Sequence, residues 1–225
     1  MNILAFIPAR GGSKGIPMKN LKVLNGKHLL DYSIESASDS KLINRIIVSS
    51  DNHIILERAK KMGVETVKRP KRISSDLSTI ESAMEHCLEH LNRKEKYVPD
   101  LIVLLQNTSP LRTARHVDEA ISLFLKNRYD SILSGYSSHH FIWRRKNNKV
   151  VPVNYDPQKR PNRQQFNDQF IENGAIYVTK YDAFKKSHCR VSGNIGMYVM
   201  PVKLSVDIDT REDLVKAEQI MKKRN

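Results

Sequence analysis

The 225-residue sequence predicts one α/β domain with a doubly wound, mostly parallel sheet, and two observations carry this prediction. Short aliphatic runs alternate with segments in which apolar residues recur every three or four positions. Most of the runs are almost continuously apolar, as strands buried on both faces of a parallel sheet must be. Strands that alternate with helices indicate βαβ units, whose helices cover both faces of the sheet.

The elements expected from these patterns follow one another along the whole chain. Strands are expected at 3–7, 45–50, 64–67, 100–106, 130–136 and 174–179. Helices are expected at 29–38, 52–62, 79–91 and 115–126. Gly63 has the position of a residue that ends the second helix. A further helix is expected after Asp209, because Thr210 and Asp213 have the spacing of a capping pair.

Residues 139–171 interrupt this alternation. The segment contains three prolines and seven Arg or Lys residues, and little of it could fill a core. We therefore expect a hairpin or arm that projects from the sheet, within a single domain that covers residues 1–225. Projecting arms in α/β enzymes usually meet another subunit, so a homodimer is expected. The alternative is a surface loop without a role.

Charge and cysteine content bound the classes of function. The net charge of +14 would suit nucleic acid, a membrane surface or an acidic substrate, but the cations are spread along the chain. Only Phe141 and Trp143 stand close together among them, so nucleic acid is not expected as a partner. Cys87 and Cys189 lie far apart, which favours a reducing, cytoplasmic compartment over a disulfide framework or a zinc site. No apolar run approaches the ~20 residues of a membrane span, so no membrane partner is expected.

The first expected strand leads into a glycine-rich loop, "PARGGSKGIPMKN". Gly11, Gly12 and Gly15 allow backbone N–H groups to approach an anion closely, and Arg10 and Lys19 supply positive charge. The loop fits neither the Walker A pattern nor the Gly-x-Gly-x-x-Gly fingerprint. Glycine turns after strands also occur without a ligand, so the predicted anion site depends on agreement with other segments.

Two carboxylates alternate with apolar residues in "SVDIDTREDL". In an extended chain Asp207 and Asp209 share one face, while Val206 and Ile208 point into the core. Like charges repel unless a cation lies between them, and hard oxygen ligands beside a triphosphate suit Mg²⁺. The sequence therefore predicts a magnesium site here. The alternative is that Asp209 caps or simply precedes the following helix.

Polar residues follow the apolar strand expected at 100–106. Ligands of open α/β sheets lie beyond the carboxyl ends of the strands, so Gln106, Thr108 and Ser109 are expected beside the glycine loop. Thr108 and Ser109 are alternatively caps of the next helix. An amide such as that of Gln106, at the end of a buried strand, needs hydrogen-bond partners.

Together these segments resemble the acylneuraminate cytidylyltransferases, also called CMP-sialic acid synthetases. The resemblance covers nearly the whole chain. Its motifs occur in the family's order and read "IPARGGSKGIPMKN", "RPKRISSDLST", "QNTSP", "HHFIW", "KRPNRQQ", "ENGAIYV" and "SVDIDTREDL". The resemblance implies a mononucleotide-binding fold, a homodimer held partly by the arm, and Mg²⁺-dependent transfer of CMP from CTP to a nine-carbon 2-keto sugar acid such as N-acetylneuraminate.

The resemblance also implies roles for individual residues. Those expected to bind the nucleotide are Arg10, Ser13, Lys19, Asn20, Arg69 and Ser78. Those expected to contact the sugar acid are Gln106, Arg160, Arg163, Gln164, Asn173 and Tyr177. Asp207 and Asp209 would hold the metal, and Asp209, Arg10 and Lys19 would be catalytic. The family's sugar site also uses a residue of the partner's arm, and which cation of "HHFIWRRK" takes that place stays open.

These residue types suit the implied reaction. The anomeric hydroxyl must attack the α-phosphorus in line and displace pyrophosphate, and the charge that builds on phosphate oxygens needs fixed cations such as Arg10 and Lys19. Asp209 or a metal-bound hydroxide would accept the proton, and Arg163 is the first choice to bind the sugar's carboxylate.

Three alternatives stay open. One is the same reaction on legionaminic acid, which differs from N-acetylneuraminate only at positions remote from the reacting centre. The second is the same reaction on the eight-carbon acid Kdo, which the segments "ENGAIYV" and "KRPNRQQ" disfavour. The third is a basic nucleic-acid-binding protein.

Overall fold

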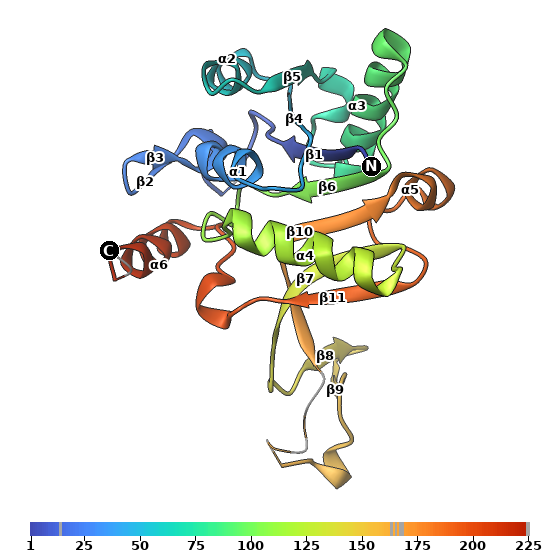
Figure 1. Ribbon diagram of the computed structural model, residues 1–225. Helices are drawn as coiled ribbons and strands as arrows, with labels where there is room; N and C mark the ends of the chain where they lie inside the picture. Colours follow the sequence, from blue (N-terminus) through green and yellow to red (C-terminus); the bar gives the residue numbers. More distant parts are fainter. Residues whose placement is uncertain (14, 163, 165, 167–168, 224–225) are drawn as a thin grey trace.

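The computed structural model describes residues 1–13, 15–162, 164, 166 and 169–223. Its centre is a seven-stranded sheet with the strand order β11-β7-β10-β6-β1-β4-β5 (Figure 1). The strands are β1 (Ile3–Pro8), β4 (Arg45–Ser50), β5 (Glu65–Lys68), β6 (Leu101–Leu105), β7 (Ser131–Ser137), β10 (Phe170–Lys180) and β11 (Ile195–Val199). All neighbours in this sheet pair in parallel except β10, which is antiparallel to both β6 and β7. The prediction of a mostly parallel sheet is therefore confirmed.

Helices cover both faces of the sheet, as a doubly wound fold requires (Figure 1). On one face, α1 (Leu29–Ser38), α2 (His53–Lys61) and α4 (Ala114–Asn127) contribute to a core with the central strands. On the other face, α3 (Ile80–Glu95) and α5 (Tyr181–Ser187) form a second core with the same strands. Within the described part of the chain, no helix combines the length and the apolar content that a bilayer crossing requires.

Helix ends follow the capping chemistry that the sequence predicts. Asn52 accepts hydrogen bonds from the first backbone N–H groups of α2, and Gly63 follows that helix with a φ of 78°. The last helix, α6 (Arg211–Lys222), begins with a reciprocal capping box between Thr210 and Asp213. The predicted capping pair is confirmed, and it fixes the point at which the carboxylate segment turns into a helix.

A short hairpin follows the glycine loop. Its strands are β2 (Val23–Leu24) and β3 (Lys27–His28), and a single 3₁₀ turn at Lys19–Leu21 leads into it. The hairpin and α6 share a third apolar cluster, in which Ile16, Val206 and Ile208 are buried. The loop after β1 and the segment before α6 are thus held against one another by packing.

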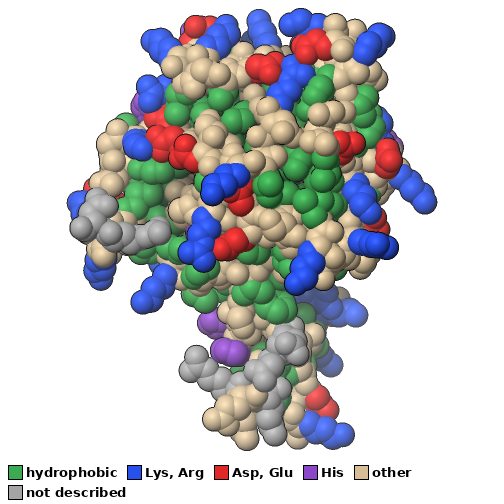
Figure 2. Space-filling view, viewed as in Figure 1, with side chains coloured by type: hydrophobic (Ala, Val, Ile, Leu, Met, Phe, Trp, Pro, Cys, Tyr) green, Lys and Arg blue, Asp and Glu red, His purple; other side chains and the backbone are tan. Residues whose placement is uncertain are grey.

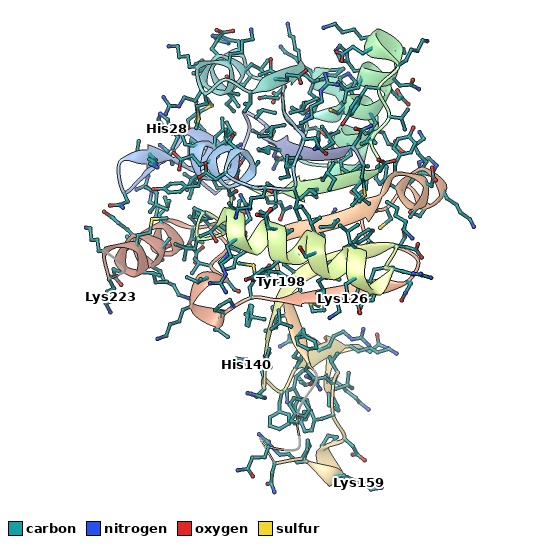
Figure 3. The ribbon with its side chains drawn as sticks, viewed as in Figure 1. His28, Lys126, His140, Lys159, Tyr198 and Lys223 are labelled. Atoms are coloured by element: carbon teal, nitrogen blue, oxygen red, sulfur yellow. The ribbon has the colours of Figure 1, made fainter. Side chains whose placement is uncertain are left out.

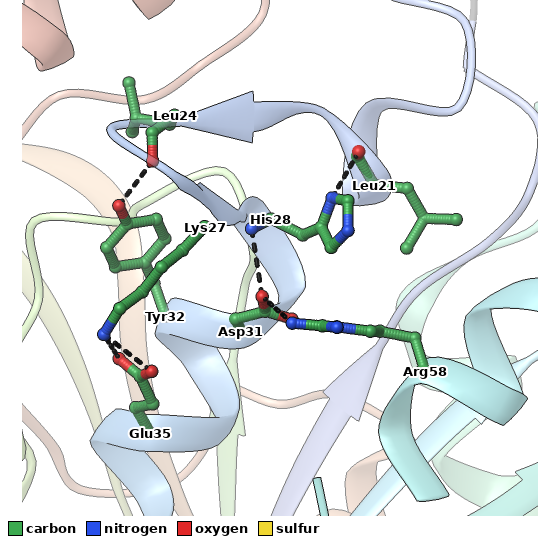
Figure 4. A network of polar contacts seen from close by, with 8 residues as sticks. All are labelled: Leu21, Leu24, Lys27, His28, Asp31, Tyr32, Glu35 and Arg58. Carbon is green, nitrogen blue, oxygen red and sulfur yellow. Dashed lines mark hydrogen bonds and ion pairs between the residues drawn. The ribbon is translucent and has the colours of Figure 1, made fainter. Parts of the chain in front are cut away.

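Polar contacts fasten the hairpin to the helices beneath it (Figure 4). The carboxylate of Asp31 is buried and accepts two hydrogen bonds from Arg58 of α2, at 2.9 and 2.6 Å. The backbone N–H of His28 donates to the same carboxylate, and its ring lies 2.7 Å from the carbonyl of Leu21. A bidentate guanidinium is the partner that a buried carboxylate needs. This network anchors the turn that carries Lys19.

The expected arm contains a second hairpin that projects from the main sheet (Figure 1). Its strands, β8 (Trp143–Lys146) and β9 (Lys149–Pro152), pair antiparallel around Asn147 and Asn148, which both have positive φ. Two consecutive residues in this conformation form the tight turn that matches the twist of a hairpin. At its base the rings of Phe141 and Tyr155 lie 4.4 Å apart. Figure 3 marks His140 and Lys159 on this arm.

Basic side chains are spread over the molecule. In Figure 2, lysine and arginine surround the face in view, and aspartate and glutamate stand between them. Cys87 is buried, Cys189 is partly exposed, and both thiols are free. The mixture of basic and acidic side chains gives no support on that face to the basic stripe that a nucleic-acid-binding surface would need.

Candidate active site

A cavity of about 280 Å³ lies beyond the carboxyl ends of β1 and β6. From β1 the chain continues to β4 and β5 on one side and later to β6 on the other, so this boundary is the topological switch point of the sheet. Open α/β sheets bind their ligands at such a point. The cavity is lined by all six residues expected to bind the nucleotide and by Gln106, namely Arg10, Ser13, Lys19, Asn20, Arg69, Ser78 and Gln106.

Arg10 connects the glycine loop to the segment at 74–79 on the opposite wall. Its guanidinium lies 2.9 Å from the carboxylate of Asp76 and donates a 2.9 Å hydrogen bond to the carbonyl of Ser75. The hydroxyl of Ser78 accepts a hydrogen bond from the backbone N–H of Ser75. A carboxylate thus occupies the anion position beside Arg10. The sequence reasoning missed Asp76, because only the fold brings it to Arg10.

Arg69 is a buried cation at the end of β5. Its guanidinium donates to the carbonyl of Ser49 at 2.7 Å and is 6% exposed. Burial lowers the pKa of Arg69, with a partial offset from the nearby charge of Asp51. An anion in the cavity would supply the counter-charge that burial demands.

Two asparagines hold the floor of the cavity together. Asn20 donates to the carbonyl of Arg10 at 2.8 Å, and Asn107 donates both to the side chain of Asn20 at 2.9 Å and to the carbonyl of Pro8 at 3.1 Å. Asn107 joins the glycine loop to the chain after β6. Sequence reasoning gave it no role, although it stands beside Gln106 at the same strand end.

The glycine loop and the carboxylate segment are in direct contact. The ammonium of Lys19 donates to the backbone carbonyl of Ile208 at 2.8 Å and to the carboxylate of Asp209 at 2.9 Å. A Cβ placed on Gly15 would lie 2.5 Å from the backbone oxygen of Asp209. The backbone N–H of Ile208 also donates to the carbonyl of Thr108 at 2.8 Å. Three segments far apart in sequence therefore meet at one edge of the cavity.

Asp207 and Asp209 share the outer face of this segment, because Val206 and Ile208, which alternate with them, are buried. The crowding of protein atoms around Asp207 raises its pKa, and the like charge of Asp209 raises it further, while a hydrogen bond with Thr108 opposes both. A cation between the two carboxylates would relieve this repulsion. In the described part of the chain, no group of three or more His, Cys, Asp or Glu residues could hold a metal. The pair offers two carboxylate ligands, so a metal held here would take its other ligands from water or a bound molecule.

The residues expected to contact the sugar acid are distributed over three places. Gln106 lines the cavity, and its side-chain oxygen lies 2.5 Å from the point where a Cβ of Gly174 would stand. Gly174 has a φ of 69°, a backbone conformation that favours glycine. Asn173 is buried in the sheet, where its amide bonds to Ser134 and Ser205. Of the described residues expected to contact the sugar acid, Gln106 lines the cavity, and Asn173, Tyr177, Arg160 and Gln164 do not.

Tyr177 is also an interior side chain. It is 2% exposed, its hydroxyl donates to Glu172, and the guanidinium of Arg190 lies 4.9 Å from its ring. Burial and the adjacent carboxylate both raise the pKa of Tyr177. The hydroxyl is therefore neutral and already engaged.

The basic residues expected to bind the acid belong to the arm. Arg160 stacks on Phe141, with 4.2 Å between the guanidinium carbon and the ring centroid. Gln164 lies in the same arm, and Arg163 is outside the described residues. Among the residues that the structure describes, none of the arm lines the cavity of the same chain.

A glycine loop, fixed cations and paired carboxylates at the switch point define a nucleotidyltransferase-like α/β domain. Residues 4–224 match the family model described as Cytidylyltransferase, and the chain belongs to this family. The resemblance noted in the sequence is thereby confirmed.

Curated relatives carry more specific names. The chain is 36% identical over 222 residues to N-acylneuraminate cytidylyltransferase A of Danio rerio, an alignment that covers 97% of this chain and 50% of that protein. It is 28% identical to the N-acylneuraminate cytidylyltransferase of Streptococcus agalactiae serotype III (strain NEM316), over 96% of this chain and 52% of that protein. The chain spans about half the length of the curated relatives it matches.

Solved structures share the fold at lower identity. A CMP:2-keto-3-deoxy-manno-octonic acid synthetase complexed with CTP superimposes with a TM-score of 0.72 at 15% identity, covering 100% of both chains. The 4-diphosphocytidyl-2C-methyl-D-erythritol synthase of Anaerococcus prevotii DSM 20548 gives a TM-score of 0.68 at 15% identity, covering 98% of this chain and 96% of that one. These likenesses confirm the nucleotidyltransferase-like fold.

Proposed function

We propose that the chain transfers CMP from CTP to the anomeric hydroxyl of a nine-carbon 2-keto sugar acid of the N-acetylneuraminate class, with release of pyrophosphate. The observation that carries the proposal is the switch-point cavity, where Arg10, Lys19 and Gln106 meet the segment that bears Asp209. The 36% identity to a protein named N-acylneuraminate cytidylyltransferase A supports the choice of acceptor.

In this proposal the cations of the cavity exchange partners when CTP binds. Arg10 leaves Asp76 and Lys19 leaves Asp209, and both bind phosphate oxygens instead. The ion pair of Arg10 with Asp76 is more than a third exposed on both sides and contributes only about 0–1 kcal/mol, so its exchange costs little. Arg10 and Lys19 then stabilise the charge that develops on the phosphate as the hydroxyl oxygen attacks and pyrophosphate leaves. We assign proton acceptance from the anomeric hydroxyl to Asp209.

Asp207 and Asp209 are proposed to hold one Mg²⁺ together with oxygens of the nucleotide. When bound, such an ion neutralises phosphate charge and orients the reacting groups. The raised pKa of Asp207 supports the assignment, because burial and the like charge of Asp209 disfavour its charged form more than Thr108 and Lys19 favour it, and a bound cation would favour it further.

The acceptor is proposed to bind beside Gln106, with the arm of a second copy completing the site. The arm exposes large apolar side chains, including Ile142, Trp143 and Val150, and such a surface suits burial against another subunit. A homodimer would bring cations of the partner's arm toward the cavity, which no described arm residue of the same chain lines. Sedimentation velocity tests this proposal: the wild type is expected to sediment as a dimer and the Trp143→Lys variant as a monomer. A monomeric wild type would refute it.

The proposed compartment is the cytoplasm, which two free thiols at Cys87 and Cys189 suit. Burial raises the pKa of the Cys87 thiol to about 12, so this group is inert.

The decisive experiment is pyrophosphate release from each nucleoside triphosphate with a panel of nine-carbon and eight-carbon sugar acids. We expect release with CTP, Mg²⁺ and N-acetylneuraminate, and much less with the other triphosphates. Faster turnover of legionaminic acid than of N-acetylneuraminate would support the proposed reaction and identify a different acceptor. Failure of CTP to react with any acid of the panel would refute the proposal.

A further inference from the structure

Arg112, in the loop between β6 and α4, is an interior cation without a counter-charge. It is 3% exposed, and its guanidinium donates to four neutral oxygens. Nη1 donates to the carbonyls of Gln106 at 3.0 Å and Ala175 at 2.9 Å, while Nη2 and Nε donate to the hydroxyls of Ser33 at 2.8 Å and Ser36 at 3.1 Å. Burial alone lowers the pKa of Arg112 to about 9. No carboxylate in the described part of the chain offsets this cost, so the side chain requires a specific reason.

Two of these oxygens lie where the ladder between β6 and β10 ends. The last paired residues of that ladder directly precede Gln106 on β6 and directly follow Ala175 on β10. The N–H of Ala175 does not extend the ladder, because it donates to the side chain of Asn173 at 3.1 Å. Nη1 of Arg112 joins the carbonyls of Gln106 and Ala175, and its 3.0 Å hydrogen bond to Gln106 is shorter than those that the same carbonyl accepts from the N–H of Ser109 at 3.4 Å and the hydroxyl of Ser33 at 3.5 Å. The guanidinium of Arg112 therefore takes the place of the next hydrogen bond between β6 and β10 at Gln106, whose side chain lines the cavity.

Gln106 is held from two directions. Arg112 binds its carbonyl, and its side-chain oxygen rests against the backbone of Gly174, which has a φ of 69°. A planar fork with five donors can reach two carbonyls on two strands and two hydroxyls on a helix at once. Lysine carries the same charge on one flexible nitrogen and cannot span them.

We propose that Arg112 is a positioning residue that sets recognition of the acceptor, because it fixes the orientation of Gln106. This inference rests on the proposed function, in which Gln106 contacts the sugar acid. Arg112 touches neither substrate, and its effect passes through Gln106. A residue that served only general stability would lower the melting temperature without separating the two substrates.

The test is a kinetic double-mutant cycle on the full chain, with Arg112→Lys, Gln106→Ala and the double variant. KM is measured for CTP and for N-acetylneuraminate separately. We expect Arg112→Lys to raise the KM of the acid about tenfold, the effect of one lost hydrogen bond, and to change the KM of CTP less than about twofold. In the Gln106→Ala background the same substitution should raise the KM of the acid less than about twofold.

Two further variants provide an alternative test and a matched control. Ser33→Ala removes one acceptor of the guanidinium and should raise the KM of the acid about threefold, which tests the idea if Arg112→Lys does not fold. Arg115→Lys is the matched control, because Arg115 is exposed and pairs only with Glu119 among its described contacts. Equal increases in both KM values, or additive effects in the cycle, would overturn the inference while leaving the proposed function intact. Absence of pyrophosphate release by the wild type would refute the proposed function itself.

Discussion

Replacement of Gly15 by alanine tests the contact between the glycine loop and the carboxylate segment. A Cβ on Gly15 would lie 2.5 Å from the backbone oxygen of Asp209, whereas ordinary contacts of a Cβ begin at 3.4 Å. The two segments must therefore separate by about 0.9 Å, the difference between these distances. The opposing atom belongs to the backbone, so no side-chain rotation can relieve the overlap.

The expected cost is that of inserting one methyl group into a packed contact, about 1–3 kcal/mol. For a domain of this length each 1 kcal/mol lowers the melting temperature by about 2–4 °C, so a fall of about 2–12 °C is expected. The displacement also pulls Asp209 from Lys19, whose hydrogen bonds to this segment measure 2.8 and 2.9 Å. Turnover should fall together with stability.

Gly12→Ala is the matched control in the same loop. A Cβ on Gly12 meets no atom within 4 Å, and Gly12 lines the cavity. This variant should keep the wild-type melting temperature and bind CTP more weakly, because the new methyl group occupies space needed by the triphosphate. Calorimetric melting and isothermal titration with CTP measure both effects. A Gly15→Ala protein that melts with the wild type, or a Gly12→Ala protein that melts well below it, would refute this reasoning.

Three further substitutions test the charged groups of the site. Asp209→Asn should lower turnover about 10²-fold or more while CTP still binds by isothermal titration, as loss of a proton acceptor predicts; near wild-type rates would remove its assigned role. Asp76→Asn frees Arg10 from an exposed ion pair and should lower the dissociation constant of CTP about 1.5–5-fold, so weaker binding would contradict the proposed exchange of partners. The folded state raises the pKa of Asp207 and thus binds its proton more tightly than the unfolded chain, so stability from this group falls as the pH rises above the ordinary pKa of an aspartate. Asp207→Asn should therefore melt at a higher temperature than the wild type at pH 7 but not at about pH 3.

The fold could be predicted because most of its elements carry a local signal. The helix at 29–38 and the strand at 45–50 have the expected bounds, since a continuous aliphatic run or an amphipathic repeat reports burial directly. β11 was missed because it lies at the edge of the sheet, where Ile195 and Val199 remain about half exposed. β8 is exposed along its length and β9 over its first two residues, so the sequence predicts their region only as a projecting hairpin or arm, without strand bounds.

The site could be predicted only where the residues that act together are also close together in the sequence. The glycine loop joins close-approach residues and cations within one turn, and that combination is visible without a structure. Arg112 gives no such signal, because all its partners are neutral oxygens contributed by α1, the end of β6 and β10. Arg160 is the reverse case, since a sequence displays its charge but not the ring of Phe141 on which it stacks.

The ion pair between Lys19 and Asp209 predicts that nucleotide and metal binding are coupled. Lys19 cannot bind a phosphate oxygen fully while it holds Asp209, and Asp209 cannot serve a cation fully while it holds Lys19. CTP that draws Lys19 away leaves Asp209 beside Asp207 without its counter-charge, which raises the affinity of the pair for Mg²⁺. Linkage requires Mg²⁺ to raise the affinity for CTP by the same factor.

This coupling can be measured by titration of CTP at several Mg²⁺ concentrations. For the wild type, we expect the dissociation constant of CTP to fall as Mg²⁺ rises, by more than the binding of Mg²⁺ to free CTP explains. In Lys19→Met the coupling should shrink, because Asp209 is available before the nucleotide arrives. In Asp209→Asn it should shrink as well, because one ligand of the cation is lost. Equal coupling in all three proteins would show that the ion pair does not link the two sites.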